Sequence, residues 1–162
     1  MKWSEASNIQ ALAMSFEWWR RTICPNVQEG SEMDFLMLTT SDILWECEIK
    51  ISMSDWKADL KKVRHYNDGW APARFYYAVP EALVENGIPE WVPAHAGVIM
   101  LYDRGDKISA RMLRQSKSLH RRKAALCIRE AMLRKIYFRY WTHVSPVIAA
   151  AAPKTLEVPD VS

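Results

Sequence analysis

Glu46-Cys47-Glu48-Ile49-Lys50-Ile51-Ser52 alternates polar and apolar residues over a length that suits a β-strand. Because successive side chains of a strand point to opposite faces of the sheet, the two glutamates, the lysine and the serine would share one face. The cysteine and the two isoleucines, preceded by Ile43 and Trp45, would form an apolar face. The stretch therefore predicts a strand with one buried face, although a solvated amphipathic strand would show the same pattern.

Asp34 makes this stretch more specific. It lies in the apolar run from Met33 to Leu38, and the residues from Thr39 to Asp42 predict a short turn after that run. The turn would fold the run back as a hairpin partner of the following strand. An Asp, a Glu and a Lys would then converge, which is the minimum set of groups for metal-assisted phosphodiester hydrolysis.

The composition predicts one soluble domain. The chain has 162 residues, of which 49% are hydrophobic and 25% charged, enough apolar material for a core. We expect a single domain over residues 1–148 and a flexible tail over 149–162. No run approaches the roughly 18 apolar residues of a membrane span. The first residues also lack the apolar region of a signal peptide. We therefore expect an intracellular protein that does not bind a membrane. The odd number of scattered cysteines predicts three buried free thiols, at Cys24, Cys47 and Cys127.

Positive charge is concentrated toward the C-terminal part of the chain. The net charge is +3, but residues 104–139 hold twelve Lys or Arg against Asp106 and Glu130, about +10, which leaves about −7 for the rest. Aromatic residues accompany these cations at Tyr137, Phe138 and Tyr140. Such a segment would attract a phosphate backbone, or it would be a surface helix whose cations balance acidic neighbours.

Periodicity and turn residues predict the order of the elements. A helix over residues 4–21 precedes an edge or irregular strand at 22–28, which Pro25 interrupts. Ser52-x-x-Asp55 has the form of a capping box and predicts a helix from there to about Tyr66. The remaining predicted elements are strands at 74–79, 96–102 and 107–113, a short helix and loop at 81–93, and a basic helix at 118–144.

The order of elements and the spacing of Asp34 and Glu48-x-Lys50 resemble the PD-(D/E)XK nuclease superfamily, and more closely its small phage and bacterial proteins similar to the MmcB-like DNA repair group. Met33 stands where the superfamily often has Pro. The resemblance covers residues 5–141 and includes Pro25-Asn26-Val27, Met33-Asp34, Glu46-x-Glu48-Ile49-Lys50-x-Ser52-x-x-Asp55-x-x-x-Asp59-x-x-Lys62, Phe75-Tyr76-Tyr77-Ala78-Val79-Pro80, 93–97, Leu119-His120-x-x-Lys123 and Arg139-Tyr140-Trp141.

The resemblance implies an α/β fold with a restriction-endonuclease-like core, a mixed central β-sheet flanked by helices, and a long basic C-terminal helix. It implies catalytic roles for Asp34, Glu48 and Lys50. Mg²⁺ or Mn²⁺ would be bound by Asp34, Glu48 and the backbone carbonyl of Ile49, because these ions prefer one or two carboxylates with water and substrate phosphate. Glu46 is a further candidate ligand, or a polar residue on a partly open strand face.

Several other residues are candidates for supporting roles. An acidic residue of the first helix serves many superfamily members as an extra ligand, and Glu5, then Glu17, would fill that place here or be plain surface carboxylates. Ser52 and Asp55 are expected to cap the second helix. We expect Asp59 to pair with Lys62 or with a C-terminal cation. The candidate DNA contacts are Lys57, Lys61, Lys62, Arg121, Arg122 and Lys123.

These features predict a divalent-metal-dependent deoxyribonuclease, expected to be an endonuclease in phage or bacterial DNA processing, repair or recombination. Its location would then be the cytoplasm of a bacterial cell or of a phage-infected host. The alternatives are a DNA-binding or assembly protein that keeps the fold and cuts little or not at all, and a structural protein. A homodimer is compatible with the expectation because cutting two strands often pairs two sites.

Overall fold

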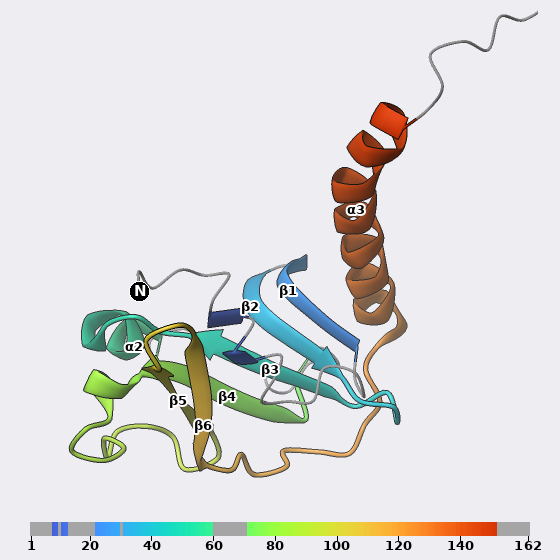
Figure 1. Ribbon diagram of the computed structural model, residues 1–162. Coiled ribbons are helices and arrows are strands. Elements are labelled where there is room, and N and C mark those ends of the chain that lie inside the picture. The colour runs from blue at the N-terminus through green and yellow to red at the C-terminus, as the bar shows by residue number, and fades with distance from the viewer. Residues whose placement is uncertain (1–7, 10, 13–21, 30, 60–70, 152–162) are drawn as a thin grey trace, which may run out of the picture.

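Six strands form one mixed sheet in the order β1-β2-β3-β4-β5-β6 (Figure 1). The structure is a computed structural model, and it describes residues 8–9, 11–12, 22–29, 31–59 and 71–151. The strands are β1 (Thr22–Glu29), β2 (Ser31–Leu38), β3 (Leu44–Ile49), β4 (Arg74–Pro80), β5 (Gly97–Asp103) and β6 (Ile108–Arg114). Outside the N-terminal segment, the described helical elements are α2 (Met53–Asp59), the 3₁₀ turn η2 (Glu81–Leu83) and α3 (Leu126–Ala151). The predicted mixed sheet with helices is confirmed.

The direction of pairing changes twice across the sheet. β1, β2 and β3 pair antiparallel, β3 pairs parallel with β4 and β4 with β5, and β6 returns antiparallel to β5. The central strand β4 is buried from Phe75 to Val79 on both of its faces, which explains why its sequence is almost continuously apolar. The strand with Pro25 lies at the sheet edge, as predicted, where a missing N–H is tolerated.

The predicted turn joins β2 to β3 in a hairpin. The Thr39 N–H donates to the Ile43 carbonyl over 3.0 Å, and the Asp42 N–H donates to the Thr39 carbonyl over 3.0 Å. Asp42 has a φ of 62°, a left-handed conformation that aspartate tolerates better than most residues. The hairpin sets Phe35 opposite Cys47, and this register decides which residues of the two strands share a face.

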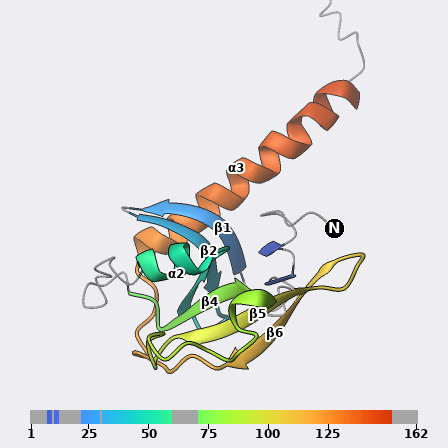
Figure 2. The ribbon, with the colours of Figure 1, turned by 90° about the vertical axis from the view of Figure 1, so that its left-hand side faces the viewer.

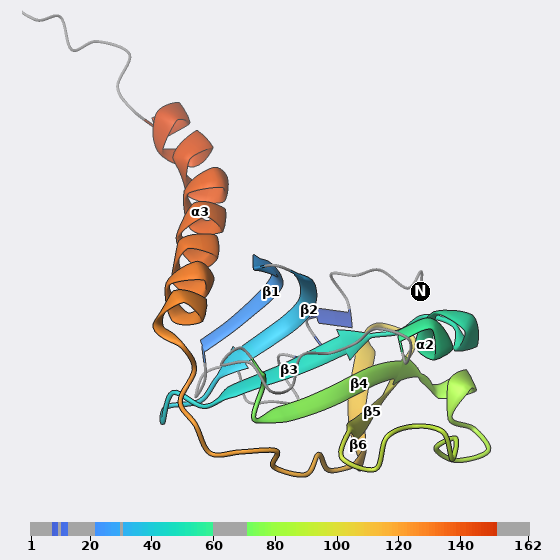
Figure 3. The same cartoon turned by 180° about the vertical axis from the view of Figure 1, so that it is seen from behind.

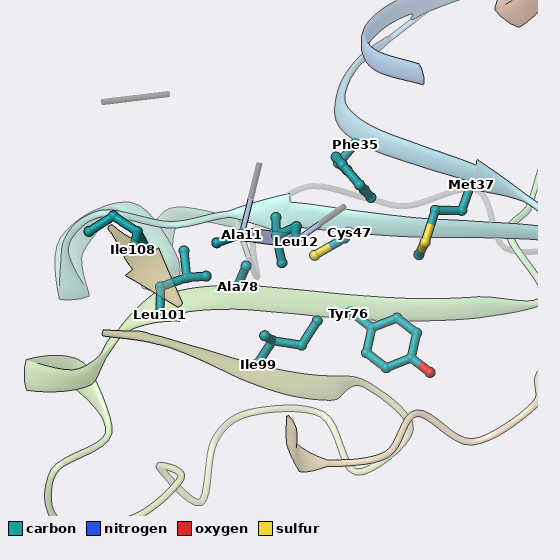
Figure 4. Packing of buried hydrophobic residues seen from close by; sticks show 10 residues of the cluster. All are labelled: Ala11, Leu12, Phe35, Met37, Cys47, Tyr76, Ala78, Ile99, Leu101 and Ile108. Carbon is teal, nitrogen blue, oxygen red and sulfur yellow. The ribbon is translucent and has the colours of Figure 1, made fainter. Parts of the chain in front are cut away.

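Apolar side chains cover both faces of the sheet. On one face, β2 to β6 pack against two residues of the N-terminal segment (Figure 4). This cluster consists of Ala11, Leu12, Phe35, Met37, Cys47, Tyr76, Ala78, Ile99, Leu101 and Ile108. On the opposite face, Trp56 of α2 packs on Phe75, Tyr77 and Val79 of β4. The face of β3 that bears Glu46 and Glu48 is therefore the one covered by α2.

The C-terminal helix begins eight residues later than the sequence predicts. Residues 115–125 run extended because their backbone is bonded to loops of the sheet: Lys117 N–H donates to the His95 carbonyl, Leu119 N–H to Ala73, and Ala124 N–H to Asp42. α3 then runs from Leu126 to Ala151, three residues into the predicted tail. Its first turns pack Ile128 and Met132 against Cys24, Leu36 and Leu44 of the sheet. Figures 2 and 3 show the rest of α3 extending past β1, away from the sheet.

The structure corrects one expectation about the cysteines, and several other predicted segments lie outside the described residues. All three cysteines are free, but Cys127 lies exposed on α3, so its predicted burial is wrong. Parts of the predicted first helix and of the second helix beyond Asp59 lie outside the described residues, as does 152–162. Within the described part of the chain, none of the helices combines the length and the apolar character that a bilayer crossing requires.

Gly97 of β5 lies where the ring of Tyr76 from β4 leaves no room for a side chain. A β-carbon added there would meet the ring of Tyr76 and would lie 2.8 Å from the backbone nitrogen of Ser116. We expect Gly97→Ala to lower the free energy of unfolding by about 2 kcal/mol or more, because the core must shift to admit one methyl group. Urea denaturation measures the change.

Gly87→Ala is the control for that substitution. Gly87 has a φ of 95° and no atom within 4 Å of the added β-carbon, so only backbone strain of about 1 kcal/mol is expected. Equal losses in the two variants would contradict the close approach at Gly97.

Candidate functional site

The β2–β3 hairpin brings Asp34 of β2 to the C-terminal end of β3. Main-chain pairing between the two strands ends at Phe35 and Cys47. Beyond it, the Asp34 Oδ2 accepts a hydrogen bond from the Ile49 N–H over 2.8 Å. The aspartate side chain thus takes the place of a main-chain carbonyl where the ladder opens. Asp34 and Glu48 come to lie on neighbouring strands, as the sequence predicts.

Lys50 is held between two buried carboxylates. Its Nζ lies 2.9 Å from Glu48 Oε2 and 3.3 Å from Asp59 Oδ1. All three residues are at most 4% exposed. The Tyr77 hydroxyl donates to Asp59 Oδ2 over 2.8 Å. Each charged group of this cluster therefore has a partner within the protein, as buried charges require.

The surroundings of Lys50 favour its charged form. Burial lowers the pKa of Lys50, but the hydrogen bond and the negative charge of Glu48, together with the charge of Asp59, outweigh it and raise the pKa above its usual value. The ammonium is therefore protonated at neutral pH. Such a group can stabilise negative charge, and it is poorly suited to accept a proton as a general base.

Helix α2 carries Asp59 onto Lys50. The Ser52 Oγ accepts the Asp55 N–H over 3.1 Å, and the Asp55 Oδ2 accepts the Ile51 N–H over 3.4 Å, so both residues cap the start of α2 as predicted. This cap starts the helix directly after β3. Trp56 and Asp59, three residues apart, then face the sheet together and are both buried.

Aromatic rings cover the ion pairs on the α2 side. The Trp56 ring centroid lies 5.7 Å from that of Tyr77 and 5.2 Å from that of Trp91. Trp56 is fully buried. The rings shield the pairs of Lys50 with Glu48 and Asp59 from water on the α2 side, which strengthens these electrostatic interactions. The aromatic residues Phe75 and Tyr77 of β4 and Trp91 are thus part of the packing.

The structure bears on the alternatives stated for two acidic residues. Glu46 is only 6% exposed, so the alternative of a polar residue on a partly open strand face is wrong; Glu46 lies on the covered face, in register with Leu36 and Phe75. The described partners of Asp59 are Lys50 and Tyr77, not a cation of the C-terminal segment. Lys62, the other expected partner, lies outside the described residues.

Sequence reasoning missed Tyr77. Its hydroxyl reaches Asp59 because β4 pairs parallel with β3 and sets Tyr77 beside Glu48. The signal in the sequence is weak: a tyrosine at alternate spacing with Phe75 reads as core, and only the register of the parallel pair identifies its neighbour.

The candidate DNA contacts are spread over several segments. Lys57 is exposed on α2, with its Nζ 6.0 Å from the ring centroid of Trp91. Arg121, Arg122 and Lys123 are exposed in the extended segment before α3, not on a helix, and Lys123 Nζ lies 3.5 Å from Asp42 Oδ2. Lys61 lies outside the described residues, as do the metal-ligand candidates Glu5 and Glu17.

The donor set at the end of β3 suits a hard cation with few protein ligands. Among the described residues, no three His, Cys, Asp or Glu side chains gather closely enough to hold a metal ion by themselves. Lys50 N–H bonds to Ala78 of β4, so the N–H and carbonyl of Ile49 point to the β2 side, where Asp34 lies. Two carboxylates and one carbonyl, completed by water and a phosphate, match the preference of Mg²⁺.

Comparison with known proteins yields one informative match. No protein-family model and no curated protein matches the chain. Among solved structures, it is similar to the SPO1766 protein of unknown function from Silicibacter pomeroyi, with 17% sequence identity and a TM-score of 0.61. The match covers 97% of this chain and 100% of the other. At this identity the likeness shows a shared fold alone.

Removing the charge of Lys50 should destabilise the protein. In Lys50→Gln, Glu48 and Asp59 remain buried without their counter-charge, so we expect the free energy of unfolding to fall by about 3 kcal/mol. Lys123→Gln is the matched control, because Lys123 is 72% exposed and its pair with Asp42 is long; we expect a change below about 0.5 kcal/mol. Chemical denaturation at neutral pH compares them. Equal effects would show that the Lys50 pairs do not stabilise the fold.

Proposed function

We propose that this chain is a divalent-metal-dependent DNA nuclease with a restriction-endonuclease-like core of the PD-(D/E)XK type. One observation carries the proposal: Asp34 and Glu48 lie on neighbouring strands at the point where the ladder opens, and the charged Lys50 is fixed beside Glu48. The resemblance in sequence assigns these three residues to the same reaction.

Each group at the end of β3 has a chemical task in this proposal. Asp34, Glu48 and the Ile49 carbonyl would hold Mg²⁺ or Mn²⁺, with Glu46 as a further ligand on the same face. The bound ion would acidify a water and neutralise charge on the scissile phosphate. The Lys50 ammonium would orient that water and stabilise the negative charge that develops on the phosphate oxygens. In this role the Lys50 ammonium would act electrostatically and not as a proton acceptor.

Asp59 and Tyr77 would act as positioning residues. Asp59, at the end of α2, touches Lys50, and Tyr77 of β4 holds Asp59; both are buried, so they would fix the direction of the ammonium without contacting DNA. Preorganisation of this kind matters because a small displacement of a catalytic group costs much of its effect.

An alternative is a DNA-binding or assembly protein that cuts little or not at all. The observation in its favour is that Lys50 is paired on both sides by carboxylates of the protein itself, as a purely structural charge would be. Metal binding and DNA cleavage distinguish the two functions.

Cleavage of supercoiled plasmid, linear duplex and a branched junction tests the nuclease. We expect cutting with Mg²⁺ or Mn²⁺, none with EDTA, and a loss of about 100-fold or more in Glu48→Gln and in Lys50→Ala. Glu85→Gln, at an exposed glutamate away from β3, is the control and should cut normally. Cutting that survives both EDTA and Lys50→Ala would sink the proposal, and DNA binding without cutting would favour the alternative.

Metal binding gives a readout that is independent of activity. Mn²⁺ should raise the Tm of the wild-type protein and of Glu85→Gln, because a ligand of the folded state alone stabilises it. Asp34→Asn and Glu48→Gln should abolish most of that rise. A Tm unaffected by Mn²⁺ and Mg²⁺ in the wild-type protein would contradict a metal site at the end of β3.

The basic segment before α3 can be tested through the salt dependence of DNA affinity. Replacing Arg121, Arg122 and Lys123 with alanine should lower the slope of log K against log salt by about 2 to 3, if each contacts a phosphate. Replacing Arg104 and Lys107 with alanine, at the exposed β5–β6 turn, is the control and should leave the slope unchanged. An unchanged slope in the triple variant would remove this segment from the DNA interface.

A further inference from the structure

Helix α3 carries two apolar stripes on opposite sides. The inner stripe, with Ile128 and Met132, is buried against β1, β2 and the start of β3. The outer stripe consists of Leu126, Leu133, Tyr137, Tyr140 and Trp141, and their exposed fractions range from 41% to 66%. At about 100° per residue, these five positions fall on the side of the helix turned away from the sheet.

The spacing of the outer stripe is that of a helix that packs on another helix. Leu126, Leu133 and Tyr140 repeat every seven residues, and Tyr137 lies four after Leu133. Alternate steps of three and four residues form the seam of a coiled coil. The ring centroid of Trp141 lies 5.8 Å from that of Tyr137 and 5.7 Å from that of Tyr140.

The area of the stripe is large for a surface without a partner. With about 200 Å² for a large side chain, the five residues together present roughly 600 Å², the upper end of what a monomer exposes. A standard interface buries about 800 Å² per partner. Phe138, which is also exposed beside the stripe, and the flanking residues would bring the total close to that value.

The chemistry of the stripe favours a protein over a nucleic acid. Leucine offers neither a charge for a phosphate nor a ring for a base, and two leucines form the N-terminal half of the stripe. The cations Arg129 and Arg134 lie on its flanks, where Arg129 pairs with Asp42 over 3.5 Å and Arg134 with Glu130 over 3.8 Å. Glu130 falls within the stripe, and its pairing with Arg134 leaves an otherwise apolar centre with charged flanks, the arrangement of a helix-helix interface.

We propose that the outer stripe of α3 binds the same stripe of a second copy of this chain, antiparallel and about a two-fold axis near Lys135. That arrangement sets Leu133 of each copy opposite Tyr137 of the other, so that the apolar centres of the two stripes meet. A parallel pair would instead align Glu130 with Glu130 and Arg134 with Arg134. The proposal does not rest on nuclease activity, and its test measures mass and distance, not cleavage.

Sedimentation equilibrium over a wide range of protein concentration tests the dimer. The wild-type chain should reach twice the mass of one chain, whereas Leu133→Glu should remain a monomer, because each introduced carboxylate would be buried against Tyr137 of the other copy without a counter-charge. Leu133 is 61% exposed, so the variant should fold, which circular dichroism and its Tm verify. Met112→Glu, on the exposed face of the edge strand β6, is the matched control and should still dimerise.

Three results of this experiment would overturn the proposal. They are a wild-type chain that stays monomeric at all concentrations, a dimer that survives Leu133→Glu, and a dimer that Met112→Glu destroys. If the wild-type chain is a monomer and Leu133→Glu lowers its affinity for DNA, the outer stripe binds nucleic acid instead, and the proposal is overturned.

The orientation of the pair can be measured at a native residue. Cys127 is exposed, while Cys24 and Cys47 are buried, and burial raises the pKa of both buried thiols, so a spin label reacts first at Cys127. In the antiparallel pair the two labelled positions lie sixteen residues apart along the axis, about 24 Å. A distance near 25 Å by pulsed electron resonance supports the pairing, whereas about 10 Å, the spacing of parallel neighbours, would overturn it.

Discussion

The structure depends on the ammonium of Lys50 being held between Glu48 and Asp59. This contact joins the end of β3 to α2, and the Tyr77 hydroxyl extends it to β4. Three elements therefore meet at charges that are almost inaccessible to water. Such an arrangement is costly to assemble, because the desolvation of each ion must be offset by its partners. A hydrophobic trio would hold the same elements together at least as well, so the retention of charges here points to a use beyond stability.

The strands around these charges could be predicted from the sequence, because the residue pattern of each strand depends only on that strand's own surroundings. Alternation in β3, the continuous apolar run of β4 and Pro25 in the edge strand each reflect the environment of a single strand. The contact of Asp34 with β3 could also be predicted from the sequence, since a tight turn allows only a few pairing registers. The contacts of Asp59 with Lys50 and Tyr77 could not be predicted from the sequence. They depend on the angle at which α2 crosses the sheet and on the register of a parallel pair, and no short stretch of sequence specifies either.

The start of α3 shows how tertiary contacts override local preference. The residues from Ser118 onward suit a helix, yet three backbone bonds to the loops at His95, Ala73 and Asp42 keep them extended. Local propensity amounts to a few tenths of a kcal/mol per residue, so a few such bonds are sufficient to outweigh it. The basic residues Arg121, Arg122 and Lys123 are consequently displayed on an irregular segment, whose backbone can adapt to a partner more readily than a helix can.

That extended segment also has a consequence for the order of folding. It starts after β6, the last strand of the sheet, and crosses to α3, which packs on β1, the first (Figure 1). The bonds to His95, Ala73 and Asp42 exist only once the loops of β2 to β5 are in place. Contacts between the first and last parts of a chain also carry the largest entropy of loop closure. We therefore expect α3 to dock last in folding and to detach first under mild denaturant, as a unit separable from the sheet by hydrogen exchange.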